Sequence, residues 1–176
     1  MSESIRKHKA EAPRKLGFGV FICSTSRYQK LAQGEKPKDV SGSLIESYLK
    51  EAGHKVLFRK IIADNKTMIE QGMQYAFSLD ELDCAIFCGG TGIAPSDITI
   101  ETVSPFLEKT LPGFGEIFRH LSFGAVGSAA VLSRAIAGVA ERKAFFCIPG
   151  SPDAVRLCFE RLILPEAPHI VKHARE

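Results

Sequence analysis

Short apolar runs that alternate with amphipathic segments are the feature that most limits how this chain can fold. Strands are expected where the apolar runs fall, at residues 16–23, 54–62, 84–88 and 144–148. Because strands that alternate with helices favour a parallel sheet, we predict an α/β fold with three layers. Its mostly parallel, Rossmann-like sheet would carry helices on both faces.

Helical spacing of apolar residues fills most of the intervals between these strands. Helices are expected at residues 39–52, 67–79, 99–104, 115–121, 129–139 and from residue 152 onward. Residues 24–38 are polar and lack this spacing, so a long loop is expected there.

The chain has the size and composition of one globular domain. Its 176 residues, 45% of them hydrophobic, are enough for one full core and too few for two ordinary domains. Five of its 23 basic residues crowd the first fifteen positions, which have no apolar periodicity. We therefore predict a flexible basic arm over residues 1–15 and a single domain over residues 16–176.

Composition also argues against several partners and sites. The net charge of +3 is small, so nucleic acid is not an expected partner. No apolar stretch reaches the roughly 18 to 20 residues of a membrane span, so we expect no membrane partner and a cytoplasmic location. The five cysteines lie in apolar runs and match no zinc or redox spacing, which predicts that they pack in the core. The five histidines are interpreted as scattered, without an i, i+4 pair, so no zinc site is expected.

The run at 84–88 stops at Gly89, Gly90, Thr91 and Gly92, which predicts a tight turn after a buried strand. Without side chains, the backbone amides of such a turn can approach a phosphate closely. Asp97 follows five positions after Gly92, where a divalent cation could bridge its carboxylate to a phosphate.

Glycine turns also join strands to helices without any ligand, so this pattern alone leaves a purely structural role open. A Walker loop is excluded because no Gly-Lys-Ser/Thr follows. Thr99 is the expected helix N-cap, with Glu101 in the first turn, which would leave Asp97 out of the cap.

Two other polar positions follow predicted strands. Asp64 comes after the strand at 54–62, and Ser151 lies in a small-residue turn after the strand at 144–148. Ligands of parallel sheets bind outside the carboxyl ends of the strands. Asp64, the glycine turn and Ser151 are therefore expected at one edge of the sheet, as one site.

Several segments, taken in order, identify a family that the chain resembles. They are Thr25-Ser26-Arg27, Asp39-x-Ser41-Gly42, Asp64, Gly89-Gly90-Thr91-Gly92, Asp97-x-Thr99-x-Glu101, Pro112-Gly113-Phe114-Gly115-Glu116-x-x-Arg119, Leu132-Ser133-Arg134, Ala137-Gly138 and Pro149-Gly150-Ser151-Pro152-x-Ala154-Val155. In order and spacing they resemble the MogA/MoaB family of molybdenum cofactor biosynthesis, and they look closer to its MoaB branch. The resemblance covers the chain from about residue 17 to its end.

This resemblance implies a molybdopterin adenylyltransferase. Such an enzyme uses Mg²⁺, ATP and molybdopterin and gives adenylylated molybdopterin and pyrophosphate. By position, Asp64 and Asp97 match the two aspartates of the family motif and would be the catalytic magnesium ligands. Gly89, Gly90, Thr91 and Gly92 would cradle phosphates, with Ser151 facing the same cleft.

Two residue roles and the activity itself stay open within the resemblance. Arg27 and Arg134 could each neutralise a phosphate or pair with a surface carboxylate. Ser96 and Ser26 stand where the family usually carries Arg and Asp or Asn, so a catalytically silent molybdopterin-binding protein or a scaffold of the same pathway is the alternative.

The family also implies a homotrimer or a hexamer built as a dimer of trimers. In this sequence the region 106–123 is rich in apolar residues, more so than a loop region normally exposes. They are Phe114, Ile117, Phe118, Leu121 and Phe123.

Overall fold

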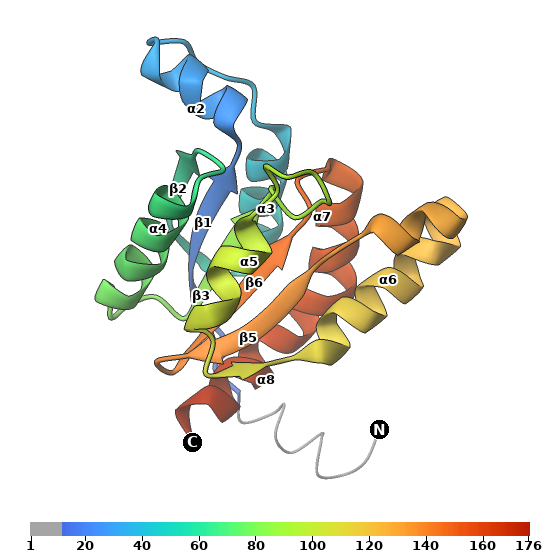
Figure 1. The fold of residues 1–176 in the computed structure, drawn as a ribbon. Helices are drawn as coiled ribbons and strands as arrows, with labels where there is room; N and C mark the ends of the chain where they lie inside the picture. The colour runs from blue at the N-terminus through green and yellow to red at the C-terminus, as the bar shows by residue number, and fades with distance from the viewer. Residues whose placement is uncertain (1–11) are drawn as a thin grey trace.

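The computed structural model describes residues 12–176 and contains one six-stranded sheet, in the order β2-β1-β3-β6-β5-β4 (Figure 1). The four strands β2, β1, β3 and β6 run parallel, while β5 is antiparallel to β6 and β4 to β5. The prediction of a mostly parallel sheet is confirmed. The strands are β1 (Gly17–Cys23), β2 (Lys55–Ile62), β3 (Cys84–Cys88), β4 (Lys109–Thr110), β5 (Ile136–Ala140) and β6 (Lys143–Ile148).

The predicted arm over residues 1–15 falls mainly on residues 1–11, which lie outside the described residues. In the described part of the chain, none of the helices has the length and apolar character needed to cross a bilayer. The helical segments are α2 (Thr25–Ala32), α3 (Val40–Glu51), α4 (Lys66–Ser78), α5 (Thr99–Val103), η1 (Ser104–Phe106), α6 (Pro112–Val126), η2 (Gly127–Leu132), α7 (Pro152–Cys158), η3 (Phe159–Ile163) and α8 (Leu164–Arg175).

Helices cover both faces of the sheet, as predicted (Figure 1). Neighbouring residues of a strand point to opposite faces, so Val20 and Phe21 of β1 enter different cores. Val20 packs in the core covered by α3, α6, α7 and α8, and Phe21 packs in the core covered by α4 and α5. The five cysteines are free and buried, which confirms their predicted place.

Two stretches differ from their predictions. Residues 24–38 are not a continuous loop, because α2 begins there with Ser24 as its N-cap, accepting a hydrogen bond from the backbone N–H of Arg27. This helix buries none of its side chains, so it carries no apolar periodicity to reveal it. Residues 129–139 are not one helix but η2 followed by β5.

Small residues explain the second error. At Gly138 of β5, an added Cβ would lie 2.6 Å from the carbonyl oxygen of Lys109, so the close approach of β4 to β5 requires glycine. Glu141 and Arg142 join β5 to β6 with positive φ values of 46° and 64°, in a tight hairpin. Short strands of small apolar residues have no period that distinguishes them from a helix.

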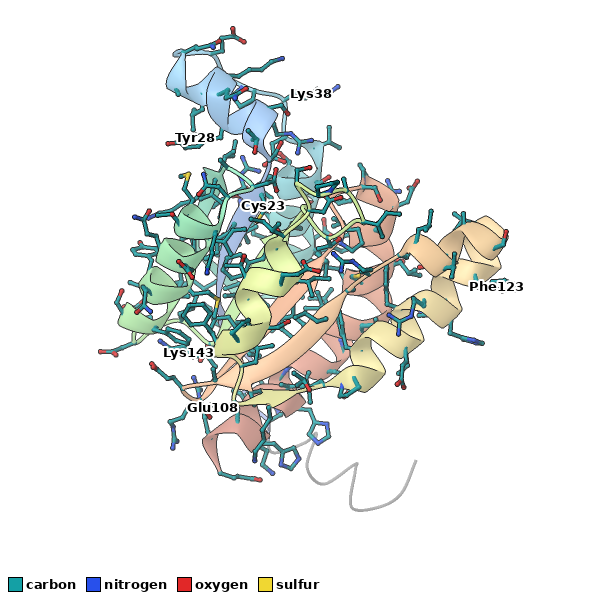
Figure 2. The ribbon with its side chains drawn as sticks, in the orientation of Figure 1. Cys23, Tyr28, Lys38, Glu108, Phe123 and Lys143 are labelled. Carbon is teal, nitrogen blue, oxygen red and sulfur yellow. The ribbon has the colours of Figure 1, made fainter. Side chains whose placement is uncertain are left out.

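Helix α6 is longer than the predicted 115–121. Some of the apolar side chains expected on the surface of this region are therefore buried. Phe114 and Phe118 are buried in the core, so they are not part of an exposed apolar surface. Ile117 and Phe123 do remain exposed, and Figure 2 shows Phe123 on the outer part of this helix.

The interpretation of the histidines as scattered is also wrong. His169 and His173 lie four residues apart on α8, on the same face of the helix.

Candidate functional site

The site predicted at one sheet edge is built from three turns. Asp64 follows β2, the glycine turn at 89–92 follows β3, and Ser151 follows β6. These strands are parallel, so their carboxyl ends point the same way. The turns also adjoin one another, since a Cβ added at Gly150 would lie 3.3 Å from Cα of Gly89.

The glycine turn is shaped by the carboxylates beside it. Gly89 and Gly90 have φ values of 111° and 61°, which residues with a side chain rarely adopt. A Cβ at Gly90 would lie 2.6 Å from Oδ1 of Asp64, and one at Gly92 would lie 2.6 Å from Oδ2 of Asp97. The two aspartates therefore lie against the same turn, two residues apart along it.

Asp64 is fixed through only one of its two oxygens. Its Oδ2 accepts hydrogen bonds from the backbone N–H of Thr25 at 2.9 Å and from the Thr25 hydroxyl at 3.3 Å. Thr25 also accepts a bond from the backbone N–H of Asp64 at 3.0 Å. Oδ1 is buried and accepts no hydrogen bond from any described residue. A buried carboxylate oxygen without a partner is costly unless a cation or a donor is bound to it.

Asp97 closes the loop that follows the glycine turn. Its Oδ2 accepts a hydrogen bond from the backbone N–H of Ala94 at 2.9 Å. Asp97 does not cap a helix. The prediction that Thr99 is the N-cap of the following helix is wrong. Helix α5 begins at Thr99 with Ile98 as the N-cap residue, and no side chain caps it. The hydroxyl of Thr99 is instead buried beside Gly90, without a hydrogen-bond partner among the described residues.

Arg134 holds the glycine turn from outside. Its Nε donates to the carbonyl oxygen of Thr91 at 2.9 Å, and its Nη2 donates to that of Gly92 at 2.6 Å. Its Nη1 lies 2.5 Å from Oε1 of Glu101 on α5. Hydrogen bonding to Arg134 lowers the pKa of Glu101 below its ordinary value. Of the two roles left open for Arg134, pairing with a carboxylate is the one seen.

The turn and Arg134 enclose a small hollow of about 310 Å³. Its wall also includes Asp97, so it brings a carboxylate, glycine amides and a guanidinium together. A neighbouring hollow of about 360 Å³ lies between α6 and α7 and shares Ser133 and Pro149 with the first.

Ser151 and Arg27 lie at the margins. The Ser151 hydroxyl caps α7 by accepting from the backbone N–H of Ala154 at 3.3 Å, and the residue lines the α6–α7 hollow. Arg27 lies on α2, where its Nε donates to the carbonyl oxygen of Lys38 at 3.2 Å, and it does not line the hollow at the glycine turn.

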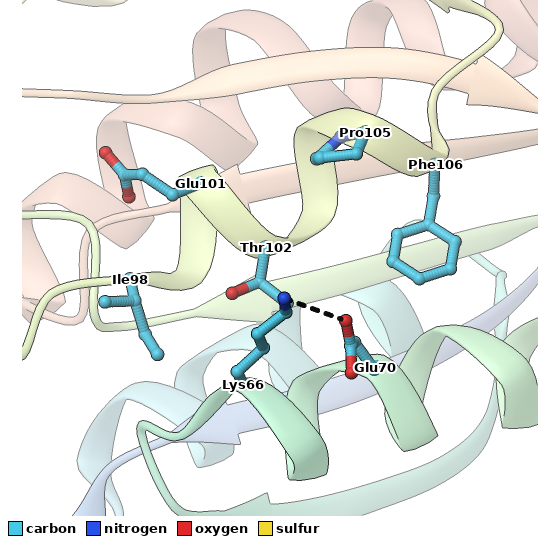
Figure 3. Close-up of a pocket in the computed structure, with 7 residues that line it drawn as sticks. All are labelled: Lys66, Glu70, Ile98, Glu101, Thr102, Pro105 and Phe106. Carbon is cyan, nitrogen blue, oxygen red and sulfur yellow. Dashed lines mark ion pairs between the residues drawn. The ribbon is translucent and has the colours of Figure 1, made fainter.

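A third hollow of about 460 Å³ lies between α4 and α5 (Figure 3). Lys66 and Glu70 line its α4 side, with Nζ and Oε1 3.9 Å apart, and Phe106 lines the far end. Glu101 lines it too, so this hollow meets the glycine turn through the Glu101–Arg134 pair.

Sequence reasoning missed the roles of Thr25 and Glu101. Thr25 lies two residues after the end of β1, so the same strand-end argument that found Asp64 points to it. Glu101 was identified only by its favourable place in the first turn of α5. Its pairing with a residue 33 positions away had no signal in the sequence.

Comparison with known proteins identifies the family. Residues 19–169 match the family model described as "Probable molybdopterin binding domain". The chain is 41% identical over 174 residues to molybdenum cofactor biosynthesis protein B of Bacillus subtilis, covering 98% of each chain. It is 40% identical over 176 residues to a Pyrococcus furiosus protein named molybdopterin adenylyltransferase, covering 98% of this chain and 99% of that one.

A solved structure agrees with the sequence matches. The crystal structure of molybdenum cofactor biosynthesis protein B superposes with a TM-score of 0.85 at 41% identity, covering 94% of this chain and 99% of that chain. The chain therefore belongs to the MogA/MoaB family of molybdenum cofactor biosynthesis proteins.

Proposed function

We propose that the protein transfers the adenylyl group of ATP to molybdopterin, with Mg²⁺, and releases pyrophosphate. The observation that carries the proposal is the pair of carboxylates, Asp64 and Asp97, against one glycine turn. Oδ1 of Asp64 is buried there without a hydrogen-bond partner among the described residues. The name molybdopterin adenylyltransferase of a relative at 40% identity supports it.

In this reaction a terminal phosphate oxygen of molybdopterin attacks the α-phosphorus of ATP. The new P–O bond replaces the bond to the β-phosphate, and pyrophosphate leaves. The attacking phosphate is already ionised near pH 7, so no Ser, Cys or His nucleophile is needed. The main obstacle is repulsion between anions, which fixed dipoles and exact positioning reduce.

The residues around the turn suit that task. The amides of Gly90 and Gly92 would bind phosphate oxygens, and Thr91 would add a hydroxyl donor. The amide of Gly89, which the sequence placed with them, instead donates to the carbonyl oxygen of Ile148 at 2.9 Å. Arg134 would hold the turn in shape through the Thr91 and Gly92 carbonyls.

The donor set also fits a divalent cation. Mg²⁺ prefers oxygen ligands and is commonly held by one or two carboxylates together with substrate phosphates. Asp64 and Asp97 would hold it, and when bound it would neutralise charge on the transferring phosphates.

The test is pyrophosphate release from purified protein with molybdopterin, ATP and Mg²⁺. We expect Asp64→Asn and Asp97→Asn to abolish release while both variants stay folded. Glu81→Gln is the matched control, because Glu81 is an exposed carboxylate near the amino end of β3 and its ion pair among residues 12–176 is with Lys55 at 2.7 Å.

Absence of pyrophosphate at saturating substrates would overturn the proposal. If molybdopterin still bound under those conditions, the protein would be a catalytically silent binding member of the family. The serines at 26 and 96 make this the natural alternative, because neither supplies a charge near the phosphates.

We also propose that the protein assembles as a homotrimer, or as a hexamer made of two trimers. Exposed apolar side chains on α6 and η2 support this, and they include Phe123 at 63% and Val131 at 79% exposure. Single exposed apolar residues are common, but a group of this size marks an interaction surface.

A further inference from the structure

Thr25, the first residue of α2, holds Asp64 through three hydrogen bonds that form a closed clamp. The backbone N–H and the hydroxyl of Thr25 both donate to Oδ2 of Asp64, at 2.9 and 3.3 Å. In return, the backbone N–H of Asp64 donates to the Thr25 hydroxyl oxygen at 3.0 Å. One hydroxyl thus bonds both the side chain and the main chain of Asp64, which fixes the carboxylate relative to its own backbone.

The clamp stands on the ends of two paired strands. The backbone N–H of Ser24, directly after β1, donates to the carbonyl oxygen of Ile62, the last residue of β2, at 2.8 Å. Thr25 and Asp64 follow these two residues within two positions. Side chains carried on strands and helices are held more precisely than side chains on loops. The clamp therefore has a rigid base.

Fixing one oxygen of Asp64 decides where the other one lies. Oδ1 lies 2.6 Å from the position that a Cβ of Gly90 would take, and the hydroxyl oxygen of Thr99 lies beside the same position. Both oxygens are buried, and neither has a hydrogen-bond partner among residues 12–176. Buried polar atoms without partners are costly, so an outside group that binds at this point would satisfy them.

We propose that Thr25 is a positioning residue, which fixes Oδ2 of Asp64 so that Oδ1 is the oxygen offered to the divalent cation. The inference rests on the proposed function, because it concerns Asp64 as a cation ligand. Groups that hydrogen-bond a metal ligand orient it, and their loss costs about 10- to 100-fold in metal affinity or activity.

A purely structural clamp would serve to join the ends of β1 and β2. The bond between Ser24 and Ile62 already joins them through the main chain. Thr25 is exposed, so its hydroxyl could bond to water instead of to Asp64 without being left unsatisfied. What the hydroxyl adds to the joint is a fixed direction of the carboxylate.

Thr25→Val tests the clamp, because it removes the hydroxyl while it keeps the shape of the side chain and the backbone N–H. Calorimetry measures the binding of a non-hydrolysable ATP analogue, once with Mg²⁺ and once with EDTA. We expect the gain in affinity that Mg²⁺ gives to fall by about tenfold, with the affinity in EDTA unchanged. The Mg²⁺ concentration for half-maximal pyrophosphate release should rise by a similar factor. Thr25→Ser restores the hydroxyl and should restore both values.

Thr67→Val is the matched control, because Thr67 is an exposed threonine in the first turn of α4, three residues after Asp64. It should match the parent in both measurements, and circular dichroism checks that every variant is folded. If Thr25→Val kept the full gain from Mg²⁺, the inference would be overturned while the transferase proposal stood. Equal weakening with Mg²⁺ and with EDTA would also overturn it, because a structural clamp predicts that result. A parent protein that gains no affinity from Mg²⁺ and releases no pyrophosphate would overturn the transferase proposal, and this inference with it.

Discussion

Three of the four residues at 89–92 are glycines because something occupies the space that a side chain would need. For Gly89 it is the carbonyl oxygen of Cys23. For Gly90 it is the hydroxyl oxygen of Thr99 together with Oδ1 of Asp64, and for Gly92 it is Oδ2 of Asp97. The carboxylates that exclude a side chain at positions 90 and 92 are thus the same ones that we propose as magnesium ligands. A side chain at position 90 or 92 would displace a proposed magnesium ligand.

Gly90→Ala tests this coupling. The new Cβ would lie 2.4 Å from Oγ1 of Thr99 and 2.6 Å from Oδ1 of Asp64, at a φ of 61°. We therefore expect loss of pyrophosphate release and a loss of about 1–3 kcal/mol in unfolding free energy. Gly124→Ala is the control, because that glycine lies within α6 with nothing within 4 Å of an added Cβ. It should stabilise the protein by about 0.5–1 kcal/mol and leave activity unchanged. An active Gly90→Ala enzyme would contradict the role given to Asp64.

Arg134 can be tested as a positioning residue rather than a phosphate ligand. One lysine ammonium cannot replace a guanidinium fork that joins Thr91, Gly92 and Glu101. Arg134→Lys and Arg134→Gln should therefore both lower kcat by about 10- to 100-fold. If the lysine variant kept most of its activity, the positive charge alone would be what matters.

Arg59→Gln is a matched control for that experiment. The side chain of Arg59 is 30% exposed against 33% for Arg134, and it also lies near carboxylates, those of Asp39 and Glu46. It holds α3 and not the glycine turn, so its loss should leave kcat close to the parent value.

At the scale of elements, α4 ends against a lysine from another part of the chain. Nζ of Lys143 on β6 donates to the carbonyl oxygens of Ala76, Phe77 and Leu79 at 2.8–3.0 Å. The last carbonyls of a helix have no partner within it, so this ammonium satisfies them. Burial lowers the pKa of Lys143 below its ordinary value, yet the three acceptors compensate the charge.

Lys143→Met should therefore weaken the end of α4. We expect a loss of about 1–3 kcal/mol in urea unfolding, with faster amide exchange in the last turn of α4. Within the part of the chain that the structure describes, Lys50→Met removes an exposed ion pair with Glu46 at 3.7 Å, and it should cost less than about 0.5 kcal/mol. Equal effects of the two changes would contradict the capping role.

His54 links β1 to β2 only while it is neutral. Its Nδ1 accepts a hydrogen bond from the backbone N–H of Leu16 at 3.3 Å, which a protonated ring cannot do. Burial lowers the pKa of His54 below its ordinary value of 6.5, against a smaller opposing effect of Asp83. Below pH 6.5 the unfolded chain binds a proton at His54, whereas the native chain, with its lower pKa, does not. The stability that neutral His54 contributes is therefore lost as the pH falls through the lowered pKa.

Urea unfolding at several pH values between 7.5 and 5 would measure this contribution. His54→Asn keeps an acceptor near Nδ1 and removes the titration, so we expect its stability to fall less steeply than that of the parent over this interval. Parallel curves for the two proteins would show that His54 does not contribute.

These elements also explain what the sequence could and could not predict. Strands and helices that bury an apolar face were predicted, because burial leaves a period in the sequence. Helix α2 buries nothing and β5 is made of small residues, so neither left such a signal. The strand-end rule located Asp64 and the glycine turn, whereas the Lys143 cap and the Arg134–Glu101 pair join distant positions that no local pattern connects.

For the whole molecule, the assembly that we propose rests on the exposed apolar group on α6 and η2. Phe123, Val126, Val131 and Leu132 are all more than half exposed, and Figure 1 shows both segments at the same outer end of the molecule. Among residues 12–176 these side chains remain exposed, and the family resemblance implies a trimer or a hexamer. Copies of this chain are therefore the partners we expect, in a closed symmetric arrangement.

Phe123→Asp combined with Val131→Asp should convert the oligomer into a monomer, as measured by light scattering after size exclusion. Two carboxylates in an apolar interface would each lose hydration without a partner. Leu31→Asp is the control, because Leu31 is an exposed apolar residue on α2, away from this group, and its change should leave the mass unaltered. A monomeric parent protein would contradict the prediction. Dissociation that spared pyrophosphate release would mean that each chain carries a complete site, as the position of Asp64 and Asp97 within one chain suggests.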